Sequence, residues 1–477
     1  MLFNSFTYLI FLALVVVLYW VVPYRFRRFL LLVASYIFYM SWMPQYGLLI
    51  FGLTVANYFI GLWLVSTAHR KPVLVLAVTV NLGVLAFFKY AGFVMDNALN
   101  IVGLWDPAVT TSWTMKIILP LGISFFTFEF IHYTVDVYRG SPPIRSFLDL
   151  ALFPAFFPTQ IAGPIKRYQN FIPQLQNLPQ FENGAFQTGC GLIVRGLFKK
   201  VVLADNLAPV VTQGFSGFQS LGFIDAWVTI VGFAFQIYFD FSGYTDIGRG
   251  SALLMGFKVP ENFNLPYLAA SIAEFWRSWH ITLSSWLRDY VYIPLGGSRG
   301  TERQTYRNLF ITMALGGLWH GASWTFVIWG MYHGVLLILH RMFSRLDWPI
   351  IRQARHRLGF ASTPLSILLT FVAVCFGYTL FRAGSVTQAV QIMLAMIGLG
   401  NGVYGDVISK TKMFEVALIA AGWLAFVLVV QWLNERSDRP WQLRTRWAML
   451  AAYYAAMMAA VVVLQPTSSA AFIYFQF

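Results

Sequence analysis

The chain has 477 residues, of which 58% are hydrophobic and only 11% are charged, and its mean hydropathy is +0.64. Soluble domains carry roughly 25% charged residues, so this composition excludes an ordinary soluble protein and predicts one embedded in a lipid bilayer. The net charge of +14 does not indicate nucleic-acid binding, because the Lys and Arg residues form short clusters between apolar runs, as membrane topology requires, and not one basic domain.

The first predicted element is a membrane helix at the N-terminus. Residues 5–22 are almost entirely apolar and are followed by Arg25, Arg27 and Arg28. The run is too long for the apolar part of a signal peptide, and it has neither a positive segment before it nor a small-residue cleavage site after it. Since Arg and Lys favour the cytoplasmic side of a membrane, we expect the N-terminus on the opposite side.

Further apolar runs follow along the whole chain, with no shift of composition that would separate domains. They lie near 29–43, 46–66, 72–88, 117–135, 148–163, 186–212, 222–240, 306–318, 323–340, 362–381, 413–433 and 446–464. Since a spanning helix needs about 20 residues, these runs predict about 11 to 13 spanning or re-entrant segments. The sequence therefore predicts an all-α polytopic membrane protein with a single membrane domain over 1–477.

The middle of the chain differs from its flanks because Pro, Gly and charged residues interrupt the apolar runs. Between 140 and 300 the interruptions are "FPTQIAGPIKRYQNF", "FDFSGYTDIGRG" and "KVPENFNLPY". Non-helical backbone at membrane depth persists only where protein or a water-filled cavity satisfies its polar groups. We therefore expect broken segments around an internal cavity, with a catalytic core at about 115–340 and scaffold helices at 1–110 and 345–477.

The stretch "EFWRSWHITLSSWLRDYVYIPLGGSRG" predicts an amphipathic helix over 274–300. At 3.6 residues per turn, Trp276, Trp279 and His280 fall on one face and Arg277 on another. Two interpretations stay open. The helix is either interfacial and anchored by its tryptophans, or it lines a cavity and presents His280 to it.

One imidazole, His320, stands inside "GGLWHGASWTFVIWG". An ionisable residue within a membrane segment is costly and indicates a functional site by default. Neutral imidazole offers one donor and one acceptor nitrogen, which suits a general base near neutral pH. The alternative is a structural histidine that hydrogen-bonds to a neighbouring helix.

Several other sites are excluded or weak. His333 follows His320 by 13 positions, so it would point about 220° away on a continuous helix. No metal-type histidine spacing or Cys/His cluster occurs, so we expect no metal site. The motifs of serine hydrolases, nucleotide-binding loops and dinucleotide folds are also absent.

Acidic residues occur in two apolar stretches. Glu129, His132 and Asp136 share one helix face, which predicts a structural polar network. Asp240 and Asp246 are expected within the membrane, where they could orient a substrate or a histidine.

Four motifs, taken together and in order, resemble the membrane-bound O-acyltransferase superfamily. They are "FPTQIAGPIKRY", "QIYFDFSGYTDIGRGSALLMGFKVPENFNLPY", "FWRSWHITLSSWLRDYVYIPLGG" and "GGLWHGASWTFVIWGMYHG". The likeness covers most of the chain and is closest to the bacterial branch typified by the membrane subunit of alginate O-acetylation; the D-alanyl-transferring relatives of teichoic-acid synthesis are more distant. It implies a ring of helices around a thinned centre, with funnels from both sides meeting at a tunnel.

The resemblance also implies catalytic residues. The family's W-H-G motif matches 319–321, so His320, next to Trp319, inherits the role of catalytic histidine. A second family histidine matches His280, with Thr282 where serine is common. His333 lies in a similar "MYHG" and is a supporting candidate.

In the implied mechanism, His320 takes the proton of an acceptor hydroxyl as its oxygen attacks a thioester. His280 or the N–H of Trp279 would stabilise the oxyanion, and the two histidine roles could be exchanged.

The resemblance implies acetyl-coenzyme A as the donor substrate, with no bound cofactor. Lys199, Lys200 and Arg249 could attract its diphosphate, although a plain positive-inside bias explains them equally. The implied function is transfer of acetyl groups from cytoplasmic acetyl-coenzyme A across the inner membrane, from a protein whose N-terminus is periplasmic. The acceptor would be a periplasmic acetyltransferase partner that O-acetylates an alginate- or cellulose-like exopolysaccharide. Alternatives are D-alanyl or other acyl transfer from a carrier protein to a cell-wall polymer, or a membrane transporter.

Overall fold

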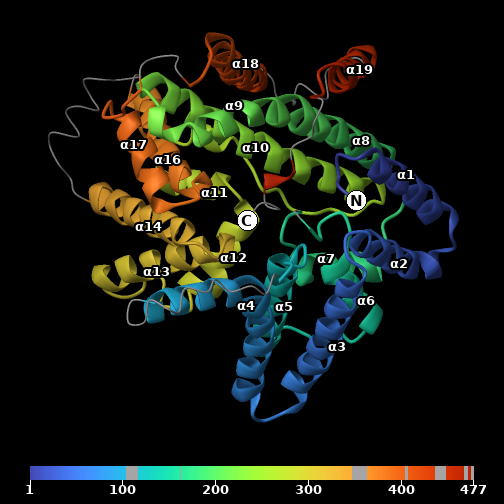
Figure 1. Cartoon of the computed structure of the whole chain (residues 1–477). Coiled ribbons are helices and arrows are strands. Elements are labelled where there is room, and N and C mark those ends of the chain that lie inside the picture. The colour runs from blue at the N-terminus through green and yellow to red at the C-terminus, as the bar shows by residue number, and fades with distance from the viewer. Residues whose placement is uncertain are drawn as a thin grey trace. The chain divides into compact units, whose positions relative to one another are not determined.

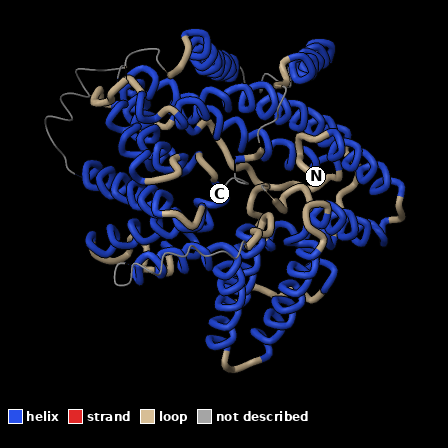
Figure 2. The backbone as a smooth tube through the Cα atoms, in the orientation of Figure 1, coloured by secondary structure: helices blue, strands red, loops and turns tan. Residues whose placement is uncertain are grey.

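A computed structural model describes residues 1–103, 117–161, 163–345, 362–402, 407–435, 447–466 and 471–473. Within these ranges the chain is helical, and its β-structure is limited to an isolated bridge between Phe263 and Trp279. Figure 1 shows the helices in chain order and Figure 2 the loops that join them. The predicted all-α class is confirmed.

The bounds of the α-helices are as follows: α1 (Phe6–Val21), α2 (Arg27–Met40), α3 (Gln45–Ser66), α4 (Arg70–Gly103), α5 (Ile123–Tyr138), α6 (Phe147–Ala155), α7 (Tyr168–Gln176), α8 (Asn183–Leu197), α9 (Asp205–Ser216), α10 (Phe223–Leu254), α11 (Ile272–Ser278), α12 (Ile281–Leu287), α13 (Glu302–His320), α14 (Trp324–Arg345), α16 (Ser362–Arg382), α17 (Val386–Met396), α18 (Lys410–Glu435) and α19 (Trp447–Val463). The segments η2 (Phe198–Ala204) and η5 (Arg288–Tyr292) are π-helical. Short 3₁₀ turns are η1 (Tyr24–Phe26), η3 (Phe218–Ser220) and η4 (Pro266–Leu268).

Five helices in the described ranges are long and apolar enough to cross a membrane, namely α3, α4, α10, α14 and α16. Shorter apolar helices are α1, α17 and the 451–463 part of α19. Large apolar side chains such as Leu14 and Val17 of α1 are exposed, as expected for a surface that faces lipid. Other predicted segments form helices too short to cross alone, such as the nine-residue α6.

The chain divides into two units. The first consists of 1–193, 247–261 and 321–323, and the second of 194–246, 262–320 and 324–477. In the first unit, α3, α4 and α5 pack together around a buried cluster of apolar side chains: Tyr39, Ile50, Leu53, Leu85, Ile123, Phe126, Phe130 and Ala155.

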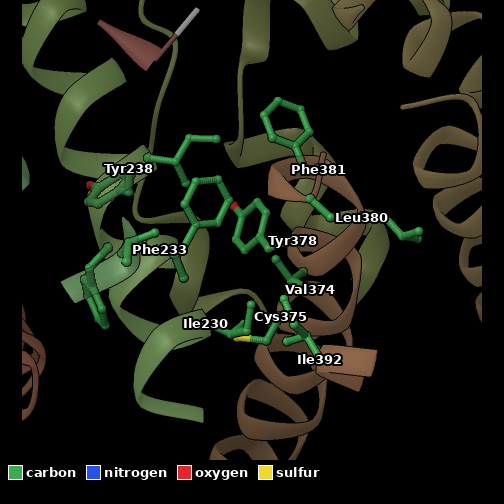
Figure 3. Close-up of a cluster of buried hydrophobic side chains, with 14 of the residues drawn as sticks. Ile230, Phe233, Tyr238, Val374, Cys375, Tyr378, Leu380, Phe381 and Ile392 are labelled. Carbon is green, nitrogen blue, oxygen red and sulfur yellow. The ribbon is translucent and has the colours of Figure 1, made fainter. Parts of the chain in front are cut away.

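The core of the second unit joins α10 to α16 and α17. Figure 3 shows Phe233 of α10 packed toward Tyr378 of α16, and Ile392 of α17 near Cys375 of α16. The Phe233 and Tyr378 rings are 5.7 Å apart and perpendicular. These large side chains are nearly fully buried, so they fix α16 against α10.

The predicted single helix over 274–300 is wrong. The chain instead forms α11, α12 and η5, and it bends at His280, whose φ of 42° is left-handed. The bend is held from a distant segment, because the Ile281 amide donates to the Asn262 carbonyl at 2.9 Å and the Thr282 hydroxyl donates to Asn262 Oδ1 at 2.6 Å. A non-glycine residue in this region costs about 1–3 kcal/mol and persists where the surroundings enforce it.

One of the three predicted interruptions is also wrong. Helix α10 continues through "FDFSGYTDIGRG", while the other two stretches contain non-helical backbone. The glycines there permit close packing. A Cβ on Gly243 would lie 2.8 Å from the Gly196 carbonyl oxygen of the second unit, and a Cβ on Gly248 would lie 2.3 Å from the Pro158 carbonyl oxygen of the first.

Helices α13 and α14 form a hairpin in which the backbones of the two helices are in direct contact. A Cβ on Gly317 would lie 2.2 Å from the Phe326 carbonyl oxygen and 2.9 Å from Gly330 Cα. At the other end of the hairpin, Arg341 donates to Glu302 at 3.1 Å. This hydrogen bond lowers the pKa of the Glu302 carboxyl.

Substituting Gly330 with alanine tests this contact. A Cβ there would lie 2.3 Å from the Met313 carbonyl oxygen, so the helices must separate, and we expect the free energy of unfolding to fall by about 1–3 kcal/mol. The matched control is Gly83→Ala on α4, where a Cβ meets nothing within 4 Å and helix propensity favours alanine. Equal melting temperatures of the two purified variants in detergent would contradict the prediction.

Candidate functional site

The second unit gathers a cluster of buried histidine and tryptophan rings. His320 is the last residue of α13 and is only 6% exposed. Its ring centroid lies 4.9 Å from Trp319, 5.0 Å from Trp329 and 5.1 Å from Phe381. The imidazole is therefore enclosed by aromatic rings from α13, α14 and α16.

His280 also packs near Trp319. Its ring is 1% exposed, and its centroid is 6.1 Å from Trp319 and 4.7 Å from Phe241 of α10. The structure thus brings together the two histidines and the tryptophan that the sequence analysis singled out. Both imidazoles contact the Trp319 ring, and His280 itself lies in a left-handed turn between α11 and α12.

His333 extends the same cluster along α14. It is 1% exposed, and its centroid lies 4.9 Å from Trp329 and 5.1 Å from Trp276. A Cβ on Gly377 of α16 would lie 2.8 Å from His333 Nε2, so the glycine makes room for the imidazole. The rings of His320 and His333 both contact Trp329.

Trp279 lies in a neighbouring aromatic group. Its ring stacks on Phe275 at 5.6 Å and Tyr267 at 6.0 Å and tilts against Tyr378 at 5.9 Å. Sequence reasoning expected its indole beside the catalytic histidine and missed Trp329, which occupies a position in the apolar run with no distinguishing signal.

The charged candidates of the second unit pair with one another. Lys200 Nζ lies 2.8 Å from both Asp205 Oδ1 and Asp240 Oδ1, and its side chain is 1% exposed. Lys199 Nζ lies 2.8 Å from Asp246 Oδ2. The lysines expected to attract a diphosphate and the carboxylates expected to orient a substrate therefore hold each other, with the lysines on η2 and the aspartates on α10.

In the first unit, Arg249 pairs with Glu261 at 2.6 Å. Two of the three polar residues on one face of α5 have polar partners on other segments. Glu129 accepts from the buried Lys166 ammonium at 2.8 Å, whereas Asp136 accepts from Gln169 at 2.7 Å. The described residues contain no group of three or more His, Cys, Asp or Glu side chains placed to hold a metal ion.

A cavity of about 290 Å³ opens beside the ring cluster, between α11, α12, η5, α13 and α14. Its lining includes Trp276, two serines, and the exposed Arg277 and Arg288. Trp276 forms part of the wall and also contacts Trp329 at 5.7 Å between ring centroids. An anionic ligand entering the cavity would meet two guanidinium groups and then the aromatic wall.

Comparison with known proteins assigns the family of this chain. The family model described as membrane-bound O-acyltransferase matches residues 141–381. A protein of Azotobacter vinelandii named "Probable alginate O-acetylase" is 42% identical over 438 residues, which cover 90% of this chain and 84% of that protein. A protein of the same name from Pseudomonas aeruginosa is 43% identical over 409 residues, covering 84% and 76%. The peptidoglycan O-acetyltransferase of Helicobacter pylori is 39% identical over 409 residues, covering 79% and 75%.

Proposed function

Because this chain belongs to the membrane-bound O-acyltransferase family, we propose that it transfers acetyl groups from cytoplasmic acetyl-coenzyme A to a periplasmic acceptor for O-acetylation of an exopolysaccharide. It is a multi-pass membrane O-acyltransferase. The names of its relatives support acetyl as the acyl group and an alginate-like polymer as the final product. In this proposal the protein resides in a bacterial inner membrane with its N-terminus in the periplasm, and a periplasmic acetyltransferase partner accepts the acetyl group.

The observation that carries the proposed chemistry is the enclosed imidazole of His320. Burial favours the neutral form of an imidazole, and the neutral ring has an acceptor nitrogen. In the proposed step this nitrogen takes the proton of the acceptor hydroxyl while the hydroxyl oxygen bonds to the thioester carbon. The carbon–sulfur bond then breaks, and the coenzyme thiolate leaves with that proton. The surrounding rings exclude water, which limits hydrolysis of the thioester.

His280 is the second histidine of the proposed site. It shares a contact with His320, because both imidazoles pack against the ring of Trp319. We assign to His280 the binding of the acceptor or of the charge that develops on the substrate. The turn at His280 is held by hydrogen bonds from the two residues that follow it to Asn262, which precedes α11 in the sequence.

The donor is proposed to enter through the cavity beside α11 and α12. Its exposed arginines, Arg277 and Arg288, suit the phosphate groups of a coenzyme A thioester. Lys200 is less suited, because its ammonium is buried between two carboxylates. Lys199, Arg249 and Arg288 each pair with one carboxylate, but Arg288 is far more exposed, with 63% of its side chain exposed against 20% for Lys199 and 19% for Arg249.

The test supplies purified protein in proteoliposomes with the periplasmic acetyltransferase partner and an alginate-like polymer as acceptor, and with two donors in parallel, radiolabelled acetyl-coenzyme A and a carrier protein loaded with labelled D-alanine. We expect release of free coenzyme thiol together with labelled product from the first donor only. Acyl transfer from the D-alanyl carrier alone would overturn the proposed donor. Passage of a solute across the membrane without consumption of either thioester would identify a transporter instead.

A further inference from the structure

Two buried indole N–H groups of the second unit have no hydrogen-bond partner among the described residues. They belong to Trp276 and Trp329, which are 9% and 3% exposed. Leaving a buried donor unpaired costs about 1–3 kcal/mol, and native proteins contain few such groups, which therefore need an explanation. Trp227 in the same unit follows the usual pattern, since its N–H donates to the Met396 carbonyl at 3.0 Å.

Trp329 lies directly beside the proposed base. Its ring is perpendicular to that of His320, with centroids 5.0 Å apart and an interplanar angle of 90°. In acyl transfer the base and the donor that stabilises the oxyanion must both reach the reacting group, the base at the attacking oxygen and the donor at the carbonyl oxygen. Two rings in contact at this distance are close enough for one small acetyl group to lie beside both.

The backbone fixes Trp329 relative to His320. Gly317 lies one turn before His320 on α13, and Gly330 follows Trp329 on α14. The space between these glycines cannot hold even one Cβ, since a Cβ on either would lie 2.9 Å from the Cα of the other. The donor is therefore held in place before substrate arrives, and preorganised donors are the ones that stabilise a transition state most.

We propose that Trp329 is a catalytic residue whose indole N–H donates to the thioester carbonyl oxygen during acyl transfer. As the acceptor oxygen bonds to the carbonyl carbon, the carbonyl electron pair moves onto its oxygen, and the indole N–H stabilises this negative charge. His320 holds the acceptor proton meanwhile. When the carbonyl re-forms, the thiolate leaves and takes that proton. The proposal rests on the proposed acetyl transfer and deepens it.

The test replaces Trp329 with phenylalanine, which keeps an aromatic ring and removes the N–H. We expect kcat to fall about 100- to 1,000-fold, while KM for acetyl-coenzyme A changes by less than about threefold, because the lost interaction exists only in the transition state. The matched control is Trp227→Phe, which removes a paired N–H remote from the base and should keep the wild-type kcat.

A second variant separates the N–H from the shape of the ring. Incorporation of β-(3-benzothienyl)alanine at 329 keeps a bicyclic side chain and replaces only the N–H by sulfur, and we expect the same loss of kcat with an unchanged melting temperature. Wild-type kcat in a folded 329 variant would overturn the assignment of Trp329 and leave the proposed function standing. A wild-type protein that transfers acetyl from no thioester would instead overturn the proposed function, and the assignment with it.

Discussion

Replacing His320 with alanine is expected to lower acetyl transfer by about 100- to 10,000-fold, the usual contribution of a general base. The His320 imidazole contacts Trp319, Trp329 and Phe381, and none of these three side chains can take a proton in its place. The measurement is the release of coenzyme thiol from acetyl-coenzyme A by the purified variant, beside its melting temperature in the same detergent.

Two control experiments show whether the effect is specific to the His320 imidazole. His340→Ala alters a half-buried histidine of α14 and should retain the wild-type rate. Free imidazole added to His320→Ala should restore part of the lost rate, because it can occupy the vacated space and accept a proton. A folded His320→Ala protein with the wild-type rate would show that this histidine is structural and would remove the basis of the mechanism.

The largest expected effect on stability comes from Lys200→Met. The Lys200 ammonium is buried between Asp205 and Asp240, whose side chains are 1% and 4% exposed. Removing one partner of a buried ion pair leaves an uncompensated charge and costs about 3–5 kcal/mol. We expect a sharp fall in the melting temperature and in the yield of folded protein, with activity lost only as the folded fraction declines.

Lys199→Met is the matched control for this prediction. The Lys199 side chain is 20% exposed, and its partner Asp246 keeps Arg195 at 3.0 Å, so we expect a smaller loss of stability. Adding Asp240→Asn to Lys200→Met should recover part of the lost melting temperature, because one of the two unpaired carboxylates is removed. Equal melting temperatures for the Lys199 and Lys200 variants would contradict the role assigned to the buried pair.

Sequence reasoning went furthest where short motifs carry the chemistry. It selected His280, His320 and Trp319, and the structure brings these three rings together. The sequence does not predict the bend at His280, because helical periodicity considers only the spacing of nearby residues. The direction of the chain at this bend depends on hydrogen bonds to Asn262, which lies outside the stretch.

The structural roles of individual glycine and tryptophan residues could not be read from the sequence either. The stretch "FDFSGYTDIGRG" predicts an interruption, but its Gly243 marks a close approach of a continuous α10 to the Gly196 carbonyl. The crossing of α13 and α14 determines which tryptophan lies beside His320, and this crossing depends on Gly317 and Gly330. In a helix that is apolar on all faces, the sequence does not show which face packs against a neighbour, because hydrophobic periodicity identifies a buried face only by its contrast with a polar one.

The π-helical segment η2 has a consequence for how this family can change over time. A π-turn holds one residue more than an α-turn and is commonly regarded as a single insertion into a helix. In η2 the consecutive Lys199 and Lys200 both pair with carboxylates of α10. Deleting one residue from η2 would rotate the helical segment before it by about 100° relative to the segment after it. Between α8 and α9, therefore, we expect changes in length to be as poorly tolerated as loss of the buried Lys200.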